Sequence, residues 1–338
     1  MFSLGSTIKD VARVSGISVT TISKYLNGVP VRKTTSEKIS RAIEELGYRP
    51  NPLARGLRNS STMTFGILVD DITNTFYTSI ISLVTEHLRS YEYSCLIHEV
   101  PAMNILQANE AVDFLSSKCV DGLFILSNRI PDSLTERLNN SFHNIVIIDS
   151  YVNGLAGDFV LTDNLAGAYH GTEQFLIRNH KKIAIITGHP DNYTANERLN
   201  GYIRAMQDYG VPICDELVCR ENYDMDGGYK AFNRLLQLSP EERPSAVLIS
   251  SYFMTIGAII AVNKHNVKIP DDISVICFDN YDMNKVFKPA LTSVAQPVED
   301  ISRKAVEFML DQVQNDSTES QIARLPPQFI QGASVRTI

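Results

Sequence analysis

Polar side chains recur directly after short apolar stretches in the larger part of the chain, residues 62–338. Carboxylates, amides and arginines can bind pairs of sugar hydroxyls through hydrogen bonds, which are costly to leave unmade once they are buried. Each residue alone could instead cap a helix or lie on the surface, but their recurrence favours a ligand pocket. The candidates are Asp70, Asp71, Thr73, Asn74, Ser127, Asn128, Arg129, Asp149, Arg198, Ser251, Tyr252, Asp279 and Asn280, with Phe76, Tyr77 and Phe287 as apolar walls for a sugar or base ring.

The N-terminal segment indicates two short helices joined by a tight turn. The first helix has apolar residues at helical spacing, namely Ile8, Val11, Ala12 and Val14. Gly16 suits the end of that helix because glycine readily adopts the left-handed conformation found there. Ser18 is a suitable N-cap for the next helix. This arrangement is typical of a helix-turn-helix unit; a small helical bundle without that role is the alternative.

The second helix, Val19 to about Asn27, is polar on one side. Its expected outward residues are Thr20, Thr21, Ser23 and Lys24, and its expected inward residues are Ile22, Tyr25 and Leu26. In a helix-turn-helix unit the second helix enters the major groove of DNA, where side chains meet base edges and hydroxyls reach phosphates. Val19 suits a thymine methyl, and Thr20 and Lys24 suit base edges. A third helix is expected from about Thr34 to Leu46.

Charge is distributed unevenly along the chain. Residues 1–60 contain 10 Lys and Arg against 4 Asp and Glu, whereas the remainder contains 21 against 34. A basic segment attached to an acidic one is the electrostatic pattern of nucleic-acid binding through the basic part.

Residues 51–61 follow the basic segment and predict a short hinge helix. Asn51 can cap it, and Pro52 suits its first turn. The helical part, Leu53, Ala54, Arg55, Gly56, Leu57 and Arg58, is too short to be stable alone in water. We expect it to fold only on DNA or against a second copy, with Leu57 as a wedge between base steps of the minor groove. An ordinary linker is the alternative.

From Thr62 onward, apolar strand patterns alternate with helical ones, first from Phe65 to Asp149 and again from Phe159 to Phe278. Such alternation predicts an α/β fold with parallel sheets and helices on both faces. Two doubly wound halves with a cleft between them are expected, and ligands of such sheets bind beyond the carboxyl ends of the strands. A last helix, about Val298 to Gln314, should return to the first half.

Several function classes are disfavoured. The sequence lacks the GxGxxG, GxxxxGK[ST], GxSxG and HExxH patterns, so we expect no enzyme, no cofactor and no metal. The five cysteines show no CxxC spacing, and we expect them to be free thiols. The N-terminus does not predict a secretory signal, and no apolar run is long enough to span a membrane. A cytoplasmic location follows as an expectation.

Two segments, TIKDVARVSGISVTTISKYLNG from Thr7 and ELGYRPNPLARGLR up to Arg58, resemble the lactose-repressor (LacI/GalR) family of bacterial transcription regulators. The resemblance implies a DNA-binding head at 1–50, a hinge at 51–61 and a two-lobed effector-binding and dimerisation domain at 62–338. It implies DNA contacts by Thr7, Ser18, Val19, Thr20, Thr21, Ser23, Lys24, Asn27, Tyr48, Asn51, Leu53, Ala54, Arg55 and Leu57. Arg32 departs from the family, which usually caps the third helix with serine.

The body also resembles this family and is similar to periplasmic sugar-binding proteins, through ILVDDITNTFY, NERLNGY, CFDN and PALTSVAQP. The implied ligand contacts are Asp71, Phe76, Tyr77, Asn128, Asp149, Arg198, Ser251, Tyr252, Asp279 and Gln296. Ser251-Tyr252 replaces the usual Asn-Asp, so the effector differs from a simple hexose or the pocket has lost affinity.

The expected function is therefore that of a dimeric repressor of a near-palindromic double-stranded DNA operator, controlled by a sugar-like small molecule. Two alternatives stay open. The body could respond to a partner protein such as a phosphorylated carrier protein, or the chain could be a solute-binding protein unrelated to DNA.

Overall fold

The computed structural model describes residues 6–26, 29–48, 61–127, 129–281, 283–315 and 319–338. The chain divides into two compact units, Met1–Met63 and Thr64–Ile338, here called the head and the body. The predicted hinge at 51–61 lies outside the described residues except for Ser61.

Three helices form the head: α1 (Ile8–Ser15), α2 (Val19–Leu26) and α3 (Lys33–Leu46). They enclose a small core of Val11, Ile22, Ile39 and Ala42. Gly16 ends α1 in the left-handed conformation, with φ of 69°, as predicted. Arg32 precedes α3 without a side-chain capping bond, which agrees with the missing serine at that position.

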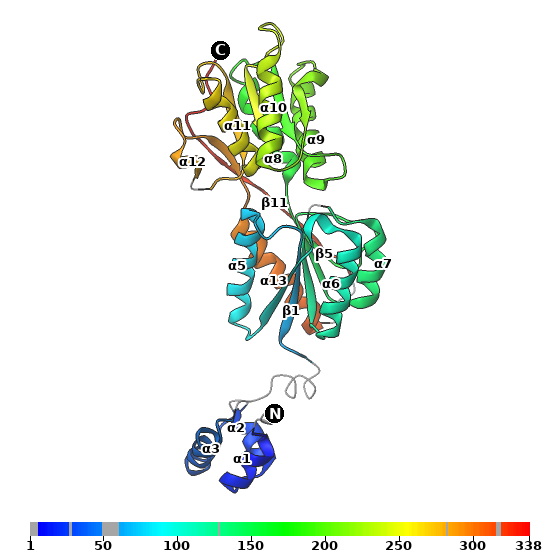
Figure 1. Ribbon diagram of the computed structural model, residues 1–338, viewed down its shortest axis with the longest axis vertical. Helices are drawn as coiled ribbons and strands as arrows, with labels where there is room; N and C mark the ends of the chain where they lie inside the picture. Colours follow the sequence, from blue (N-terminus) through cyan, green and yellow to red (C-terminus); the bar gives the residue numbers. More distant parts are fainter. Residues whose placement is uncertain (1–5, 27–28, 49–60, 128, 282, 316–318) are drawn as a thin grey trace. The chain divides into compact units, whose positions relative to one another are not determined.

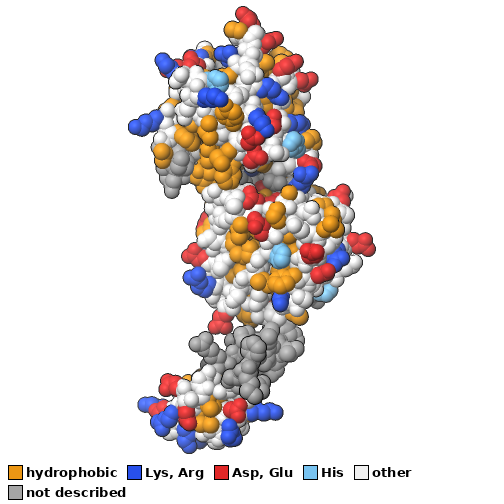
Figure 2. Space-filling model, in the orientation of Figure 1, with side chains coloured by type: hydrophobic (Ala, Val, Ile, Leu, Met, Phe, Trp, Pro, Cys, Tyr) orange, Lys and Arg blue, Asp and Glu red, His pale blue; other side chains and the backbone are white. Residues whose placement is uncertain are grey.

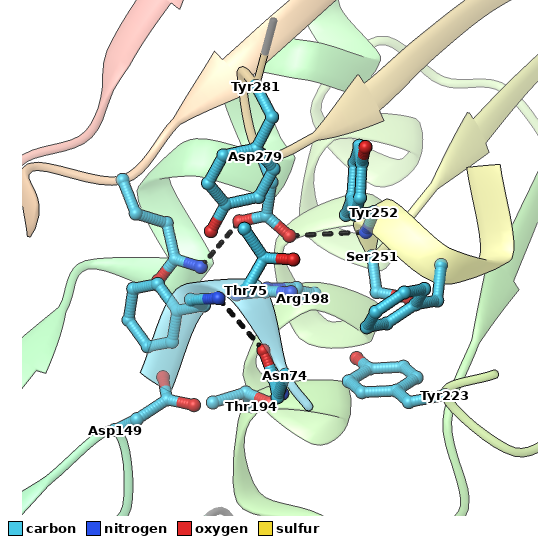
Figure 3. Close-up of a pocket in the computed structure, with 13 residues that line it drawn as sticks. Asn74, Thr75, Asp149, Thr194, Arg198, Tyr223, Ser251, Tyr252, Asp279 and Tyr281 are labelled. Carbon is cyan, nitrogen blue, oxygen red and sulfur yellow. Dashed lines mark hydrogen bonds between the residues drawn. The ribbon is translucent and has the colours of Figure 1, made fainter. Parts of the chain in front are cut away.

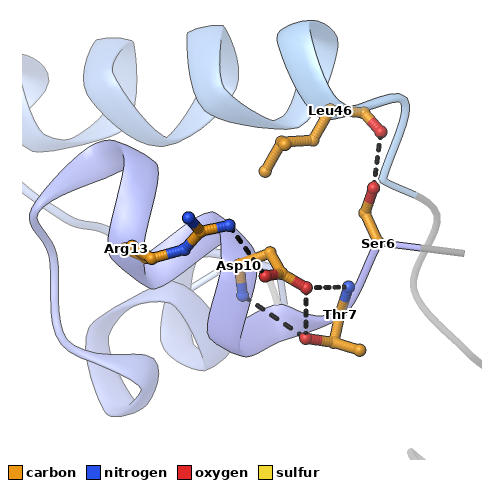
Figure 4. A network of polar contacts seen from close by, with 5 residues as sticks. All are labelled: Ser6, Thr7, Asp10, Arg13 and Leu46. Carbon is orange, nitrogen blue, oxygen red and sulfur yellow. Dashed lines mark hydrogen bonds and ion pairs between the residues drawn. The ribbon is translucent and has the colours of Figure 1, made fainter.

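A reciprocal hydrogen-bond network fixes the start of α1 (Figure 4). The Thr7 hydroxyl oxygen accepts the Asp10 N–H, and the Asp10 carboxylate accepts the Thr7 N–H at 3.0 Å. The Thr7 hydroxyl and the Thr7 N–H both donate to the Asp10 carboxylate and lower the pKa of Asp10, which also pairs with Arg13. The neighbouring Ser6 hydroxyl donates to the Leu46 carbonyl at 2.8 Å and so joins the beginning of α1 to the end of α3.

Each half of the body is one sheet covered by helices on both faces (Figure 1). The sheet of lobe 1 has the order β11-β5-β4-β3-β1-β2 and is parallel throughout. Its strands are β1 (Thr64–Val69), β2 (Ser94–Glu99), β3 (Gly122–Leu126), β4 (Ile145–Ile148), β5 (Asp158–Thr162) and β11 (Ile322–Leu325). Its helical segments are α5 (Thr75–Arg89), the short η1 (Pro101–Met103), α6 (Ile105–Ser117), α7 (Asp132–Ser141) and α13 (Val298–Asn315).

Lobe 2 repeats this plan with the order β12-β10-β9-β8-β6-β7, in which only β12 is antiparallel to its neighbour. Its strands are β6 (Ile183–Thr187), β7 (Val218–Arg220), β8 (Ala246–Ile249), β9 (Ser274–Phe278), β10 (Thr292–Ala295) and β12 (Gln328–Ile330). Its helical segments are α8 (Asn164–Leu176), α9 (Tyr193–Asp208), η2 (Asp215–Leu217), α10 (Met225–Gln237), α11 (Tyr252–Lys264) and α12 (Met283–Val286).

The central strands of both sheets are apolar on both faces, because helices cover each side. In lobe 1, α5 and α13 bury one face of the sheet and α6 and α7 bury the other. In lobe 2, α10 and α11 cover one face and α8 and α9 the other.

The chain passes between the lobes after β5, after β10 and between β11 and β12. The predicted return of the last helix to the first half is therefore confirmed.

The elements that were not predicted from the sequence are α7, α12, β7, β10, β11, β12 and the two short helices η1 and η2. Helix α7 is mostly polar and buries only Leu134 and Leu138, so its helical periodicity is weak. The four strands contain three or four residues each and do not show a continuous apolar run. Among the described helices, none has the length and apolar composition needed to cross a bilayer.

We expect replacement of Thr7 by alanine to loosen the start of α1, because a lost N-cap typically costs about 1 kcal/mol. This corresponds to roughly fivefold faster hydrogen–deuterium exchange of the α1 amides in the full chain. Thr7→Ser keeps the capping oxygen and is the matched control. Equal exchange rates in the two variants would show that the cap contributes nothing.

Candidate functional sites on the head and in the cleft

The second helix of the head exposes the N-terminal residues that were expected to read DNA. Val19 is 41% exposed although it is apolar, and Thr20 and Lys24 are also exposed. Ser18 precedes the helix and its hydroxyl oxygen accepts the Thr21 N–H at 3.3 Å. An exposed apolar side chain can contact a thymine methyl group, and hydroxyl and ammonium groups beside it can form hydrogen bonds with base edges and phosphates.

Ser23 was expected to point outward, and this expectation is wrong. The residue is only 8% exposed and lies beside the fully buried Ile22. Polarity alone was a poor guide, because a small hydroxyl side chain can be buried within the head. Tyr48 is half-buried against the core of the head, and Thr7 is exposed with its hydroxyl engaged in the α1 cap.

Seven of the expected site residues lie outside the described residues, and the structure says nothing of them. They are Asn27, Asn51, Leu53, Ala54, Arg55, Leu57 and Asn128.

Basic side chains lie on several sides of the head (Figure 2). The exposed ones are Lys9, Arg13, Lys24, Arg32, Lys33, Lys38 and Arg41. Acidic side chains are also visible on the head, and the body carries both charge signs over its visible face (Figure 2). The excess of basic residues that the sequence shows in its N-terminal segment therefore lies at the surface of the head.

A pocket lies in the body between residues that follow the strands of both lobes (Figure 3). Its lining comprises Asn74, Thr75, Phe76, Asp149, Thr194, Arg198, Tyr223, Ser251, Tyr252, Phe253, Asp279, Tyr281 and Gln296. Five of these thirteen side chains are aromatic, and most of the others offer hydrogen-bonding groups. We call it the cleft pocket.

Arg198 of α9 is the one cation among the residues lining this pocket, and it is only 3% exposed. Its Nε donates to Asn164 Oδ1 at 2.8 Å, and its Nη1 donates to the Ser250 carbonyl. The guanidinium lies over the Phe278 ring at 4.1 Å from the ring centroid. These contacts hold the planar group rigidly, which suits recognition of a ligand by directed hydrogen bonds.

Asp279 follows β9 and anchors a chain of hydrogen bonds. Gln296 Nε2 donates to one Asp279 oxygen at 2.7 Å, and the Tyr252 N–H donates to the other at 3.2 Å. The Thr162 hydroxyl in turn donates to Gln296 Oε1 at 2.7 Å. Because Thr162 belongs to lobe 1 and Asp279 to lobe 2, this chain links the lobes behind the pocket.

Asp149 follows β4 and enters the pocket from lobe 1. The Tyr77 hydroxyl donates to its Oδ2 at 3.4 Å, while its Oδ1 has no hydrogen-bond partner among the described residues. Burial raises the pKa of Asp149 to about 7, with Asp279 adding to the increase and Arg198 opposing it. A buried carboxylate oxygen without a hydrogen-bond partner destabilises the folded protein. A ligand that donates a hydrogen bond to this oxygen would therefore gain binding free energy.

The two aspartates occupy equivalent positions in the two lobes. Each follows a central strand, and each donates its backbone N–H to the next strand, Asp149 to Val160 and Asp279 to Val294. Both have positive φ, 69° and 71°, which is uncommon for a residue other than glycine. Such strained conformations cluster at binding sites, where the surrounding structure stabilises them.

Most of the described ligand candidates meet in the cleft pocket. Phe76, Asp149, Arg198, Ser251, Tyr252, Asp279 and Gln296 line it, and Tyr77 lies behind Asp149. Ser251 also caps α11, since its hydroxyl oxygen accepts the Met254 N–H at 3.3 Å. The Tyr252 ring packs edge-on against Tyr281 at 4.8 Å between centroids.

Asp71 does not line the cleft pocket, and its contact with a ligand stays a prediction. Its carboxylate is used locally, because it accepts the N–H and the hydroxyl of Thr73 at 2.8 and 2.6 Å. The sequence analysis also missed five lining residues, Thr75, Thr194, Tyr223, Phe253 and Tyr281. The same strand-end rule, extended by three residues beyond β9, would have found Tyr281, whereas Tyr223 follows β7, which was not predicted.

The cleft pocket has a volume of only about 40 Å³. This is room for little more than one water molecule, and a sugar ring would not fit. A ligand therefore requires the lobes to part or the aromatic side chains to move. The described residues include no group of three or more His, Cys, Asp and Glu side chains that could hold a metal ion.

Comparison with known proteins gives two family matches. Residues 7–51 match the family described as bacterial regulatory proteins, lacI family, and residues 172–335 match the family described as periplasmic binding protein-like domain. The HTH-type transcriptional repressor PurR of Vibrio atlanticus (strain LGP32) is 30% identical over 335 residues, which are 98% of this chain and 99% of that protein. Catabolite control protein A of Priestia megaterium is 30% identical over 324 residues, with 95% and 96% coverage.

Solved structures show the same fold. The lac repressor dimer bound to operator and the anti-inducer ONPF aligns with a TM-score of 0.87 at 20% identity, over 98% of this chain and 99% of that one. The complex of the transcriptional regulator CelR with cellobiose aligns with a TM-score of 0.74 at 25% identity, over 97% and 99%.

We expect the Asp149 carboxylate to destabilise the folded body as the pH rises. Its folded pKa of about 7 lies above the unfolded value of about 4, so the penalty is absent at low pH, grows between about pH 4 and 7, and is constant above. Asp149→Asn mimics the protonated form. Its advantage in thermal unfolding over the parent chain should grow across that interval towards roughly 4 kcal/mol. An advantage that is independent of pH would contradict this assignment.

Proposed function

The chain belongs to the lacI family of bacterial regulatory proteins and is a DNA-binding transcriptional repressor, not an enzyme; we propose that it binds a near-palindromic operator as a dimer under the control of a sugar-like ligand in the cleft pocket. The head would supply the contacts to DNA, and the body would supply the ligand site and the dimer contacts. This assignment covers the whole of the described chain.

The exposed side of α2 supports the DNA part of the proposal. Val19, Thr20 and Lys24 present one apolar, one hydroxyl and one ammonium group, as an α-helix in the major groove requires. The other exposed basic residues of the head would lie near phosphates. A twofold dimer places two such heads on two half-sites, which is why the operator should be close to palindromic.

The buried Arg198 of the cleft pocket is the observation that carries the ligand part. Its fixed guanidinium faces two carboxylates, Asp149 and Asp279, from the two lobes. Adjacent hydroxyls of a sugar can donate to a carboxylate and accept from a guanidinium at the same time. The aromatic walls would pack against the apolar face of the ring. The solved CelR structure, which contains cellobiose, is compatible with a carbohydrate in this fold.

Control of DNA binding would follow from the position of the ligand between the lobes. A ligand that binds one arrangement of the lobes more tightly shifts the population towards it. A coupling free energy of about 1–3 kcal/mol between cleft and operator changes occupancy many-fold.

For the DNA site, we expect Lys24→Ala to weaken operator binding by roughly tenfold or more, because one lost base contact costs about 1–3 kcal/mol. Lys38→Ala removes an exposed lysine of α3 that would lie near phosphates, so it should weaken binding to selected and random DNA equally and is the matched control. The operator can be selected from a random DNA library, and fluorescence anisotropy at fixed salt then gives the affinities. Equal losses on selected and random DNA would mean that Lys24 does not read bases.

For the ligand site, a thermal-shift screen of sugars, sugar phosphates and nucleobases should yield a compound that stabilises the parent chain. At 100 times its dissociation constant, a ligand adds about 2.7 kcal/mol of stability. Arg198→Ala and Asp279→Ala should each abolish the shift, whereas Asp71→Ala should preserve it because that carboxylate lies outside the pocket. A shift that survives Arg198→Ala would place the ligand elsewhere, and a screen without any hit would favour control by a partner protein.

A further inference from the structure

A second cavity, of about 180 Å³, shares Tyr223 with the cleft pocket as a common wall. Lobe 1 contributes Asp70, which follows β1, and Arg129, which follows β3; lobe 2 contributes Glu221 and Asn222, which follow β7. The second cavity is therefore built like the cleft pocket, from residues beyond the carboxyl ends of parallel strands, where ligands of such sheets bind.

Tyr223 is held firmly between the two cavities. The Ser250 hydroxyl donates to its phenol oxygen at 3.3 Å. On another side the ring lies so close to Gly188 that a Cβ there would be 2.9 Å from the ring carbon Cε1. A residue with any side chain at position 188 would displace the ring. Tyr223 thus offers a fixed aromatic surface at the junction of the two cavities.

The other groups around the second cavity are planar and polar. The Asp70 carboxyl accepts a hydrogen bond from the Ser127 hydroxyl at 2.6 Å, and burial raises its pKa to about 6. Arg129 of lobe 1 pairs with Asp191 of lobe 2 across the cavity wall. One aromatic ring together with carboxylate, amide and guanidinium groups suits a second sugar ring. A flat base would find only one ring on which to stack.

Charge in both cavities disfavours an anionic ligand. In the second cavity, Asp70, Asp191 and Glu221 outnumber Arg129, whose charge is already shared with Asp191. In the cleft pocket, two aspartates face one arginine. A phosphorylated sugar would therefore add negative charge to surfaces that are already acidic, at a cost that grows with burial.

We propose that the effector is an uncharged disaccharide, with one ring in the cleft pocket against Arg198 and Asp279 and the second ring in the second cavity, on the far side of Tyr223. This rests on the proposed function of the cleft pocket and specifies its ligand. The larger free volume lies in the second cavity, so the second ring requires less rearrangement than the first.

Isothermal titration of the full chain tests the proposal with matched probes. Glucose is compared with cellobiose and maltose, and galactose with lactose and melibiose, with adenosine and cytidine as two-ring compounds of another class. Ala102 is exposed and lines the second cavity from lobe 1, so Ala102→Trp should fill that space. Glu110→Trp places the same ring on the exposed side of α6 and is the control. Glu221→Ala serves as a second variant if Ala102→Trp lowers the thermal stability.

One disaccharide should bind at least tenfold more tightly than its component monosaccharides. Ala102→Trp or Glu221→Ala should remove this advantage, Glu110→Trp should keep it, and Arg198→Ala should remove binding of both rings.

A disaccharide advantage that survives Ala102→Trp and Glu221→Ala overturns the proposal. So does a monosaccharide that binds as tightly as its disaccharide, although in that case the cleft pocket keeps its proposed function. Binding of a nucleoside alone rejects the carbohydrate assignment, and binding of none of the probes rejects the disaccharide.

Discussion

The buried guanidinium of Arg198 is the constraint on which the body depends. Removing a charge from water is expensive unless the surroundings return the lost hydrogen bonds. Here Asn164, the Ser250 carbonyl and the Phe278 ring hold the group in place. They come from separate elements of lobe 2, so the arginine is oriented before any ligand arrives.

The remaining features of the cleft follow from this cation. Asp279 is tied to the start of α11 and to Gln296, whereas Asp149 approaches from lobe 1 with one oxygen unbonded among the described residues. Asp279 is therefore held in place by hydrogen bonds within the protein, whereas Asp149 can still accept a hydrogen bond from a ligand. Because they belong to different lobes, a ligand that binds both also fixes the distance between the lobes. The lobes are joined by three chain crossings.

Sequence reasoning was reliable where one physical rule acts alone. Strand ends of parallel sheets gave Asp149, Asp279 and Ser251 in the pocket, and helical spacing with Gly16 and Ser18 gave the helices of the head. It was less reliable where a polar residue had a choice of partners. Asp71 bonds Thr73 locally, while the preceding Asp70 faces Ser127 and the second cavity. Ser23 was placed outside because it is polar, although its small side chain is buried. The aromatic walls depend on contacts distant in sequence, such as Tyr252 against Tyr281, which no local pattern encodes.

We propose that occupancy of the cleft and binding of the operator are coupled. The most direct measurement is titration of the effector into the full chain, with and without saturating operator DNA. Coupling is reciprocal for binding free energies, so the effector affinity should change several-fold with DNA, and the operator affinity should change by the same factor with effector. Identical effector affinities in the two titrations would contradict the coupling, and the cleft would then have no part in the control of the head.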